Sequence, residues 1–191
     1  VFFRRSLPTQ RKHCVALVLD ESGSMAEPKK SAALASLLLF MESLEQVNVN
    51  YAIIGFSETP VIHKDFSKRL TMAKREELFE EVSMYIPSGL TADADALALA
   101  TKLICEADED VIKLIIVITD GEGNINQTGK SFFELQEEAF KKNVLVIGVG
   151  LGEKAKSVKK RYHFPIIVKN VKDLPKTLAR ILEEKIVFRY H

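Results

Sequence analysis

Cysteine is scarce in this sequence, with two residues in 191. Cys14 lies in a strand-like run and Cys105 in a helix-like run, so we expect two small buried side chains rather than a disulfide. The four histidines are scattered, and no spacing among histidines and cysteines is typical of a zinc site. Sparse, unpaired cysteine is typical of a protein in a reducing compartment.

Long apolar runs and excess charge are also missing. No run reaches the roughly 20 apolar residues that span a bilayer, and the opening residues VFFRRSLPTQRK lack the apolar core of a signal peptide. The formal net charge is +1, which gives no general attraction to nucleic acid or to an anionic membrane. We therefore expect a cytoplasmic protein with neither of these partners.

The composition and length suit one globular domain. Hydrophobic residues make up 47% of the chain and charged residues 28%, enough for a large core and a polar surface. We expect residues 1–12 to form an N-terminal tail and residues 13–188 to form the domain.

Short apolar runs alternate with helical patterns along the chain. This alternation predicts an α/β fold with a doubly wound, Rossmann-like, mostly parallel sheet and helices on both of its faces. We expect Val111–Thr119, the most apolar run, to be the central strand and the half-polar Val61–Phe66 to be an edge strand. The other predicted strands are His13–Leu19, Asn50–Phe56, Asn143–Val149 and Pro165–Val168; the predicted helices are Lys29–Gln46, Thr71–Tyr85, Ala92–Glu106, Ser131–Lys142 and Lys172–Lys185.

Polar clusters stand where two of these strands end and where one helix begins. Asp20, Ser22 and Ser24 follow the first strand, Thr91 opens the third helix, and Asp120 follows the central strand. In sheets of this kind, ligands bind beyond the carboxyl ends of the strands. We therefore expect these side chains to meet at one edge of the sheet.

This combination of carboxylates and hydroxyls suits a hard cation. Mg²⁺ prefers about six oxygen ligands and takes only one or two carboxylates from protein. In Asp20-x-Ser22-x-Ser24, a tight loop that turns alternate side chains inward would bring three oxygens together, and Gly23 eases that turn. We predict Mg²⁺ at this site, with Mn²⁺ as the alternative ion.

The polar residues of these clusters resemble the metal-ion-dependent adhesion site of von Willebrand factor A (integrin I-like) domains. The resemblance lies in Asp20-x-Ser22-x-Ser24, the distant Thr91 and Asp120-Gly121. The order of elements is also similar from about His13 to Lys185. The resemblance implies six strands in the order 3-2-1-4-5-6, with strand 3 antiparallel. It implies direct ligation by Ser22, Ser24 and, in one state, Thr91. Asp20 and Asp120 would act through the metal or its waters, and a partner's carboxylate would fill the open position.

One segment departs from the family pattern. The family often has Gly-Gly-Thr followed by Asp or Asn, whereas this chain has Gly89-Leu90-Thr91-Ala92. The acids Asp93 and Asp95 follow close by, and we expect them to be first-turn acids favoured by the helix dipole, with support of the metal site as the alternative.

The function that these features imply is a non-enzymatic, metal-dependent protein-binding module whose partner supplies an Asp or Glu carboxylate. The sequence Asp20-Glu21-Ser22-Gly23-Ser24-Met25 and the segments Tyr162-His163-Phe164-Pro165 and Leu174-Pro175 resemble the intracellular branch of the family, whose members work with AAA+ ATPases. That branch includes the metal-chelatase subunits, the nitric-oxide-reductase activation proteins and midasin. We therefore expect an adaptor for an AAA+ ATPase complex.

Three other functions remain open at this stage. One is an extracellular-type adhesion domain, and another is a structural module whose metal site is unused. The third is a Mg²⁺-dependent phosphatase of the haloacid-dehalogenase type, which needs a second aspartate two residues after the nucleophile. Ser22 stands there instead.

Four further features have simple structural interpretations. Gly148-Val149-Gly150-Leu151-Gly152 copies only part of a dinucleotide fingerprint, so we expect a strand-end turn. The basic run from Lys154 to Arg161 predicts a solvated helix face, and Glu21 and Glu122 are expected to be solvated. Helical spacing places three phenylalanines in the core: Phe132, Phe133 and Phe140.

Overall fold

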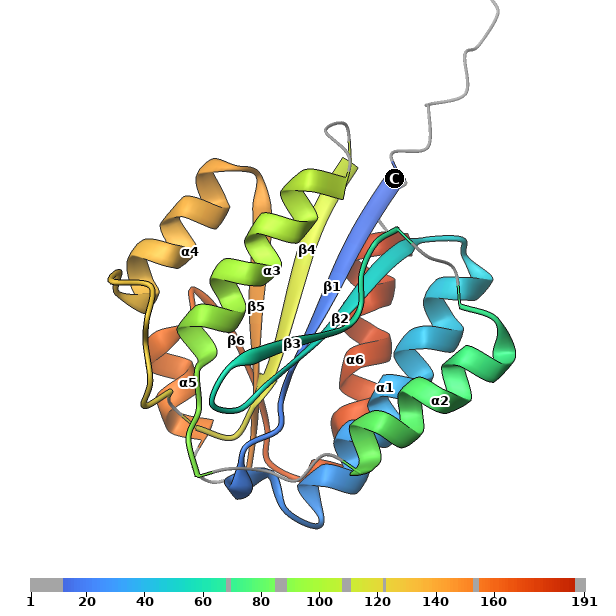
Figure 1. The fold of residues 1–191 in the computed structure, drawn as a ribbon, viewed down its shortest axis with the longest axis horizontal. Coiled ribbons are helices and arrows are strands. Elements are labelled where there is room, and N and C mark those ends of the chain that lie inside the picture. The colour runs from blue at the N-terminus through green and yellow to red at the C-terminus, as the bar shows by residue number, and fades with distance from the viewer. Residues whose placement is uncertain are drawn as a thin grey trace, which may run out of the picture.

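The sheet follows the predicted strand order. The computed structural model describes residues 12–67, 70–84, 89–107, 111–121, 123–152 and 155–187. Its six strands are ordered β3-β2-β1-β4-β5-β6, and β3 is the antiparallel strand at one edge (Figure 1). The strands are β1 (Lys12–Asp20), β2 (Asn50–Phe56), β3 (Pro60–Lys64), β4 (Val111–Thr119), β5 (Val144–Leu151) and β6 (Phe164–Val168).

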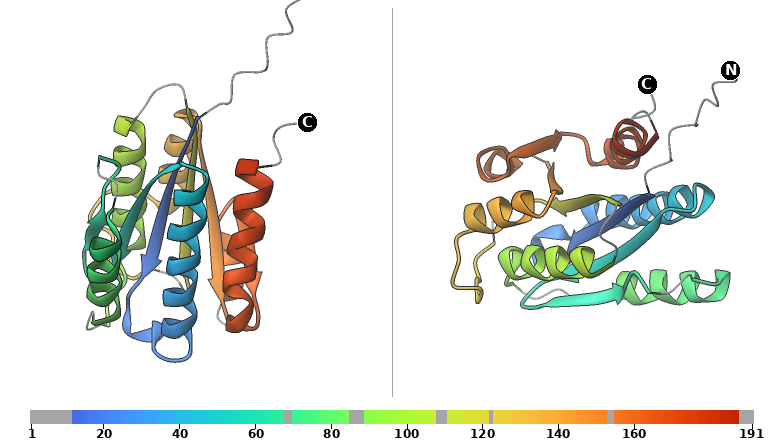
Figure 2. Two further views of the ribbon diagram at one scale, coloured as in Figure 1. Left: turned by 90° about the vertical axis from the view of Figure 1, so that its right-hand side faces the viewer. Right: turned by 90° about the horizontal axis from the view of Figure 1, so that it is seen from above.

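Helices cover both faces of this sheet, as Figures 1 and 2 show. The helices are α1 (Lys29–Gln46), α2 (Met72–Met84), α3 (Asp93–Ala107), α4 (Phe132–Lys141), α5 (Lys156–Arg161) and α6 (Leu174–Leu182). Side chains of α1, α2 and α6 pack against one face, and those of α3, α4 and α5 against the other. The predicted doubly wound α/β architecture is confirmed.

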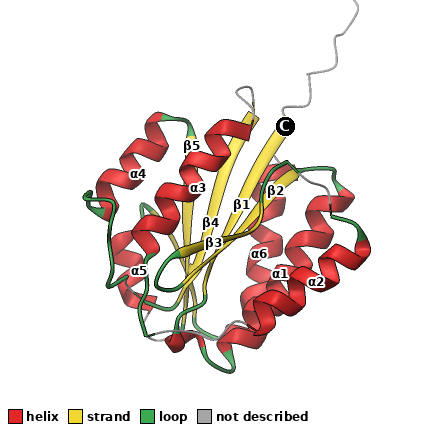
Figure 3. Cartoon of the chain, viewed as in Figure 1, coloured by secondary structure: helices red, strands yellow, loops and turns green. Residues whose placement is uncertain are grey.

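The two central strands are buried on both faces, which explains their continuous apolar sequences. In β1, Val15, Leu17 and Leu19 face the core under α1 and α6, while Ala16 and Val18 face the core under α3. Strands β1 and β4 pair in parallel, so their carboxyl ends meet at the lower edge of the sheet in Figure 3. This edge carries the polar clusters.

Several helix boundaries differ slightly from the sequence expectation. Helix α4 begins after Ser131, which forms a capping box with Glu134 and so fixes its start. Helix α6 ends at Leu182 and continues as a π-helical turn, Glu183–Val187, where a single longer helix was predicted. The predicted end of the second helix at Tyr85 lies outside the described residues.

The expectation of three core phenylalanines was wrong for two of them. Phe132 is 7% exposed and packs edge-on against Tyr162. Phe133 and Phe140 are 59% and 64% exposed. In α4 the buried positions are Phe132, Leu135, Gln136 and Ala139, and this stripe leaves Phe133 and Phe140 on the outer side of the helix.

Neither cysteine forms a disulfide, and Cys14 is buried whereas Cys105 is half-buried. Within the described ranges, no helix is long and apolar enough to cross a membrane.

Candidate metal centre

The loop after β1 folds back so that its polar side chains share one point. Oδ1 of Asp20 accepts a hydrogen bond of 2.9 Å from the backbone N–H of Ser22. A single 3₁₀ turn, Gly23–Met25, follows, and it brings the hydroxyl oxygens of Ser22 and Ser24 to within 3.1 Å of each other. The structure therefore places three of the five predicted ligand residues together.

The loop after β4 joins this cluster through Asp120. The hydroxyl of Ser24 donates a hydrogen bond of 2.7 Å to Oδ1 of Asp120. The Asp120 carboxylate also forms an ion pair with Nζ of Lys29, the first residue of α1. Asp20, Ser22 and Asp120 are each less than 5% exposed, whereas Ser24 is exposed, so the cluster is a group of mostly buried oxygen atoms that is open to solvent at Ser24.

Burial and like charge make Asp20 an unusual carboxylate. Its burial raises its pKa above the ordinary value, and the nearby negative charge of Asp120 adds to this shift. Hydrogen bonds from Ser22 and Thr119 act in the opposite direction and lower the pKa. Two acidic groups close together and away from water favour a bound cation, because a cation offsets their repulsion.

Thr91, just before α3, is bound to the loop after β4 and is 8% exposed. Its backbone N–H donates a hydrogen bond of 2.8 Å to Oδ1 of Asn124, and its carbonyl accepts one of 2.9 Å from the N–H of Asn124. Among the described residues, the hydrogen bonds of Thr91 involve its backbone N–H and carbonyl, and none joins its hydroxyl to Asp20, Ser22, Ser24 or Asp120. Thr91 thus differs from these four predicted ligands, which are hydrogen-bonded to one another.

Asp93 does more than the first-turn role expected for it. It lies in the first turn of α3 and is 2% exposed. Oδ2 accepts a hydrogen bond of 3.1 Å from Gly123, and Oδ1 accepts one of 2.8 Å from Nη2 of Arg161. Burial raises the pKa of Asp93, while the charge of Arg161 and the hydrogen bond from Gly123 counteract this shift. Asp93 therefore ties the loop that carries Asp120 to α3 and α5.

Asp95 binds the same loop farther along, because its carboxylate accepts a hydrogen bond of 3.1 Å from the backbone N–H of Gln127.

The basic run from Lys154 to Arg161 was expected to be a solvated helix face. This is wrong for Arg161, whose guanidinium lies 4.2 Å from the centre of the Phe132 ring. Lys159 and Lys160 are exposed, and Lys154 lies outside the described residues.

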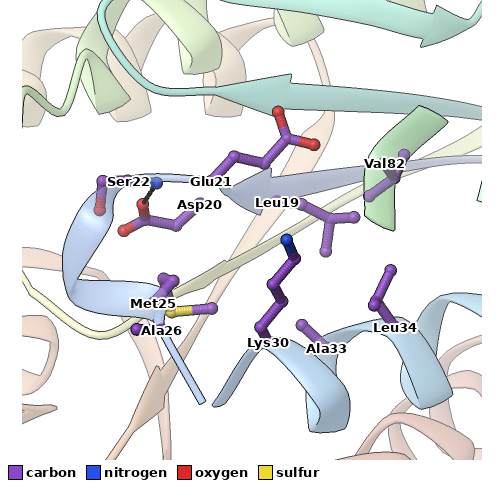
Figure 4. Close-up of a pocket in the computed structure, with 10 residues that line it drawn as sticks. All are labelled: Leu19, Asp20, Glu21, Ser22, Met25, Ala26, Lys30, Ala33, Leu34 and Val82. Atoms are coloured by element: carbon purple, nitrogen blue, oxygen red, sulfur yellow. Dashed lines mark hydrogen bonds between the residues drawn. The ribbon is translucent and has the colours of Figure 1, made fainter. Parts of the chain in front are cut away.

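Glu21 is not solvated, contrary to expectation. Its side chain is 7% exposed, and Oε1 lies 2.9 Å from Nε2 of His63 in β3. Figure 4 shows the Glu21 carboxylate directed away from Asp20 and Ser22, along the wall of a small pocket of about 50 Å³ behind the loop. Glu21 therefore ties the loop to the neighbouring strands. The other glutamate expected to be solvated, Glu122, lies outside the described residues.

The glycines in the second half of β5 serve packing. A Cβ at Gly148 would overlap the ring of Tyr162, and one at Gly150 would lie 2.8 Å from Cβ of Ala155. These glycines let α5 approach the sheet closely. The expected strand-end turn is limited to Gly152, because β5 continues to Leu151 and includes Gly148 and Gly150.

No group of three or more His, Cys, Asp or Glu side chains that could hold a metal occurs within the described ranges. The cluster at the sheet edge has two carboxylates, and hydroxyls supply its remaining oxygens. All of its donors are hard oxygen atoms, which fit Mg²⁺ or Mn²⁺.

Sequence reasoning missed the residues that support this cluster. Thr119 donates a hydrogen bond of 2.5 Å to Oδ2 of Asp20, Asn124 holds Thr91, and Lys29 contacts Asp120. Only Lys29 carried a usable signal, since a lysine in the first turn of a helix opposes the helix dipole.

The fold and this arrangement of loops define a doubly wound α/β domain of the von Willebrand A type. The family model of the von Willebrand factor type A domain matches residues 15–163, and the chain belongs to this family.

Solved structures with the same fold come from several sources. Proximal thread matrix protein 1 from the mussel byssus has a TM-score of 0.73 and 16% sequence identity to this chain. The match covers 91% of this chain and 48% of the byssus protein. A von Willebrand factor type A protein from Catenulispora acidiphila has a TM-score of 0.70 and 20% identity, and the match covers 92% of this chain and 43% of that protein. The pilus adhesin SpaC from Lactobacillus rhamnosus GG has a TM-score of 0.74 and 14% identity, and the match covers 92% of this chain and 31% of the adhesin. The chain thus spans less than half the length of each of these proteins.

One structure of the mussel byssus protein has zinc in its metal-ion-dependent adhesion site (MIDAS) motif. It is 16% identical to this chain, with a TM-score of 0.71.

Proposed function

We propose that this domain is a metal-dependent protein-binding module in which a divalent cation at the sheet edge binds a carboxylate from a partner protein. One observation carries the proposal: Asp20, Ser22, Ser24 and Asp120 form a single hydrogen-bonded cluster of oxygens where β1 and β4 end. Three of the four residues are buried and Ser24 is exposed. A cation there would be held by few negative charges and would keep its attraction for one more anion.

The residues divide into two roles in this proposal. Ser22 and Ser24 would bind the ion directly, and Thr91 would join them in one state of the loop. Asp20 and Asp120 would balance its charge directly or through waters. The bound ion supplies an electrophilic position for the partner's Asp or Glu side chain. Mg²⁺ is the ion proposed and Mn²⁺ the alternative, and the zinc-containing mussel byssus protein makes Zn²⁺ a third ion to test.

The finer assignment is an adaptor for an AAA+ ATPase in the cytoplasm. We propose it on the resemblance of three segments to the intracellular branch of the family: Asp20–Met25, Tyr162–Pro165 and Leu174-Pro175. An extracellular-type adhesion domain is the competing function, and the similarity to a byssus matrix protein and a pilus adhesin favours testing it in parallel. Both functions use the same metal site and the same kind of partner group.

Metal titration followed by partner capture tests the proposal. Wild type, stripped of metal by EDTA, should bind Mg²⁺ or Mn²⁺ in calorimetry and should then retain a purified AAA+ or adhesion partner only while the ion is present. Asp120→Ala should weaken ion binding roughly 10- to 100-fold, the range seen when groups that support a metal site are removed. Glu106→Ala removes the same charge from an exposed position on α3 and should bind the ion normally.

The competing functions predict different results. If Ser22→Ala combined with Ser24→Ala left partner binding intact, the metal site would be unused. Mg²⁺-dependent hydrolysis of a chromogenic phosphate ester, lost in Asp20→Asn, would instead indicate a phosphatase.

A further inference from the structure

Lys29 makes two contacts with the candidate metal centre. Its ammonium group forms an ion pair with Oδ2 of Asp120 and donates a hydrogen bond of 2.9 Å to the carbonyl of Ser24. The side chain of Lys29 is 24% exposed and that of Asp120 is 3% exposed. A positive charge therefore lies at the solvent side of a buried carboxylate that the proposed function assigns to the metal.

The position of Lys29 in its own helix is unfavourable. Lys29 begins α1, whose first turn contains no acidic residue and whose N-cap, Pro28, offers no side-chain hydrogen bond. The N-terminus of a helix carries partial positive charge and disfavours cations. The contact with Asp120 must offset this cost, so the lysine is held there by the cluster and not by its helix.

The charge of the cluster is what Lys29 changes. Asp20 and Asp120 are linked by hydrogen bonds through Ser22 and Ser24, and the hydroxyls of these serines add no charge. An ammonium group bound to Asp120 reduces the electrostatic attraction of the cluster for any further cation. It also stabilises Asp120 whenever a divalent cation does not.

We propose that Lys29 is a built-in competing cation: its ammonium group and the divalent ion weaken each other's binding to Asp120, so that ion binding releases Lys29. This inference rests on the metal site of the proposed function and adds the residue that sets its affinity. Lys29 acts through Asp120 and is therefore a positioning residue rather than a ligand.

Four proteins test the proposal: wild type, Lys29→Met, Lys29→Arg, and Lys102→Met, which removes an exposed lysine of α3. After treatment with EDTA, each is titrated with Mn²⁺ by calorimetry, and its thermal midpoint is measured with and without the ion. We expect Lys29→Met to bind Mn²⁺ about tenfold more tightly, a change of ~1.4 kcal/mol, and to unfold at a lower temperature than wild type in EDTA. Lys29→Arg and Lys102→Met should resemble wild type in both measurements.

A second measurement uses wild type alone, in case Lys29→Met does not fold. Brief acetylation with acetic anhydride, followed by mass spectrometry, reports how freely each lysine reacts. Lys29 should react faster with Mn²⁺ than with EDTA, while Lys102 should react equally in both. Equal reactivity of Lys29 in the two conditions would overturn the proposal.

The outcomes separate this inference from the proposed function. If wild type takes up no Mn²⁺, Mg²⁺ or Zn²⁺, the metal site itself is refuted. If wild type takes up the ion and Lys29→Met binds it equally or more weakly, the metal site stands and the competing role of Lys29 is refuted.

Discussion

The hydroxyl of Thr119, at the end of β4, donates a hydrogen bond of 2.5 Å to Oδ2 of Asp20, at the end of β1. The two residues belong to neighbouring parallel strands in the centre of the sheet. This contact holds Asp20 in a site that is 4% exposed, close to a second negative charge. A carboxylate is thus fixed in a position that disfavours its ionised form.

The first prediction follows from this cost. In EDTA, Asp20→Asn should be more stable than wild type by on the order of 1 kcal/mol, because it removes a buried charge. Its amide can still bond both neighbours: the amide oxygen accepts from the N–H of Ser22, and the amide NH2 donates to the hydroxyl oxygen of Thr119. The same variant should gain little or no stability from Mg²⁺, whereas wild type should gain it. Chemical denaturation in EDTA and in Mg²⁺ measures both effects. A variant less stable than wild type in EDTA would show that Asp20 is not disfavoured in this site.

The second prediction concerns two glycines in the loop after β4. A Cβ at Gly123 would overlap the carboxylate of Asp93, whereas a Cβ at Gly121 meets nothing within 4 Å. Gly123→Ala should cost about 1–3 kcal/mol of stability through overpacking and should weaken ion binding, because Asp93 helps to hold the loop that carries Asp120. Gly121→Ala should cost much less in both denaturation and metal titration. Equal effects would indicate that Asp93 does not support the loop.

The third prediction concerns the pH dependence of His63. Its side chain, 1% exposed, lies between Glu21 and Glu81. Burial lowers its pKa, but the two glutamates outweigh burial and raise it above the ordinary 6.5. A raised folded pKa gives stability that is complete below pH 6.5 and is lost as the pH rises through the folded pKa.

Denaturation across the pH range measures this effect. The stability difference between wild type and His63→Gln should be largest below about pH 6.5 and should shrink above it. Glu81→Gln should reduce this pH-dependent part, whereas Glu80→Gln, an exposed neighbour on α2, should not. A difference that stays constant with pH would rule out the ion pairs of His63 as its source.

The fourth prediction compares neighbouring phenylalanines. Phe132→Ala should cost about 3 kcal/mol or more, because it removes a buried ring that contacts Tyr162. Phe133→Ala should cost under about 1 kcal/mol, because its ring is exposed. Thermal unfolding of the two variants decides the point, and similar losses would place both rings in the core.

The sequence was sufficient to predict the strands and the position of the polar cluster, for a simple physical reason, whereas the strand order was implied by the family resemblance. Strands β2 and β4 contain the apolar runs Tyr51–Phe56 and Leu114–Ile118, and a polar residue after such a run is expected at the sheet edge. The contacts between distant residues could not be predicted in the same way. The pairs Lys29–Asp120 and Asp93–Arg161 are separated by 91 and 68 residues, and only the packed structure decides which of many charged side chains meet.

The bonds around Asp93 and Asn124 have a mechanical consequence. Asn124 binds the backbone of Thr91 through both its side chain and its N–H, and Asp93 holds Gly123 on one oxygen and Arg161 on the other. The loop that carries Asp120 therefore cannot shift without moving the start of α3, and Arg161 extends this constraint to α5 beside β6. We expect the loop, the start of α3 and α5 to be displaced together, as one stiff unit that connects the metal centre to the far edge of the sheet.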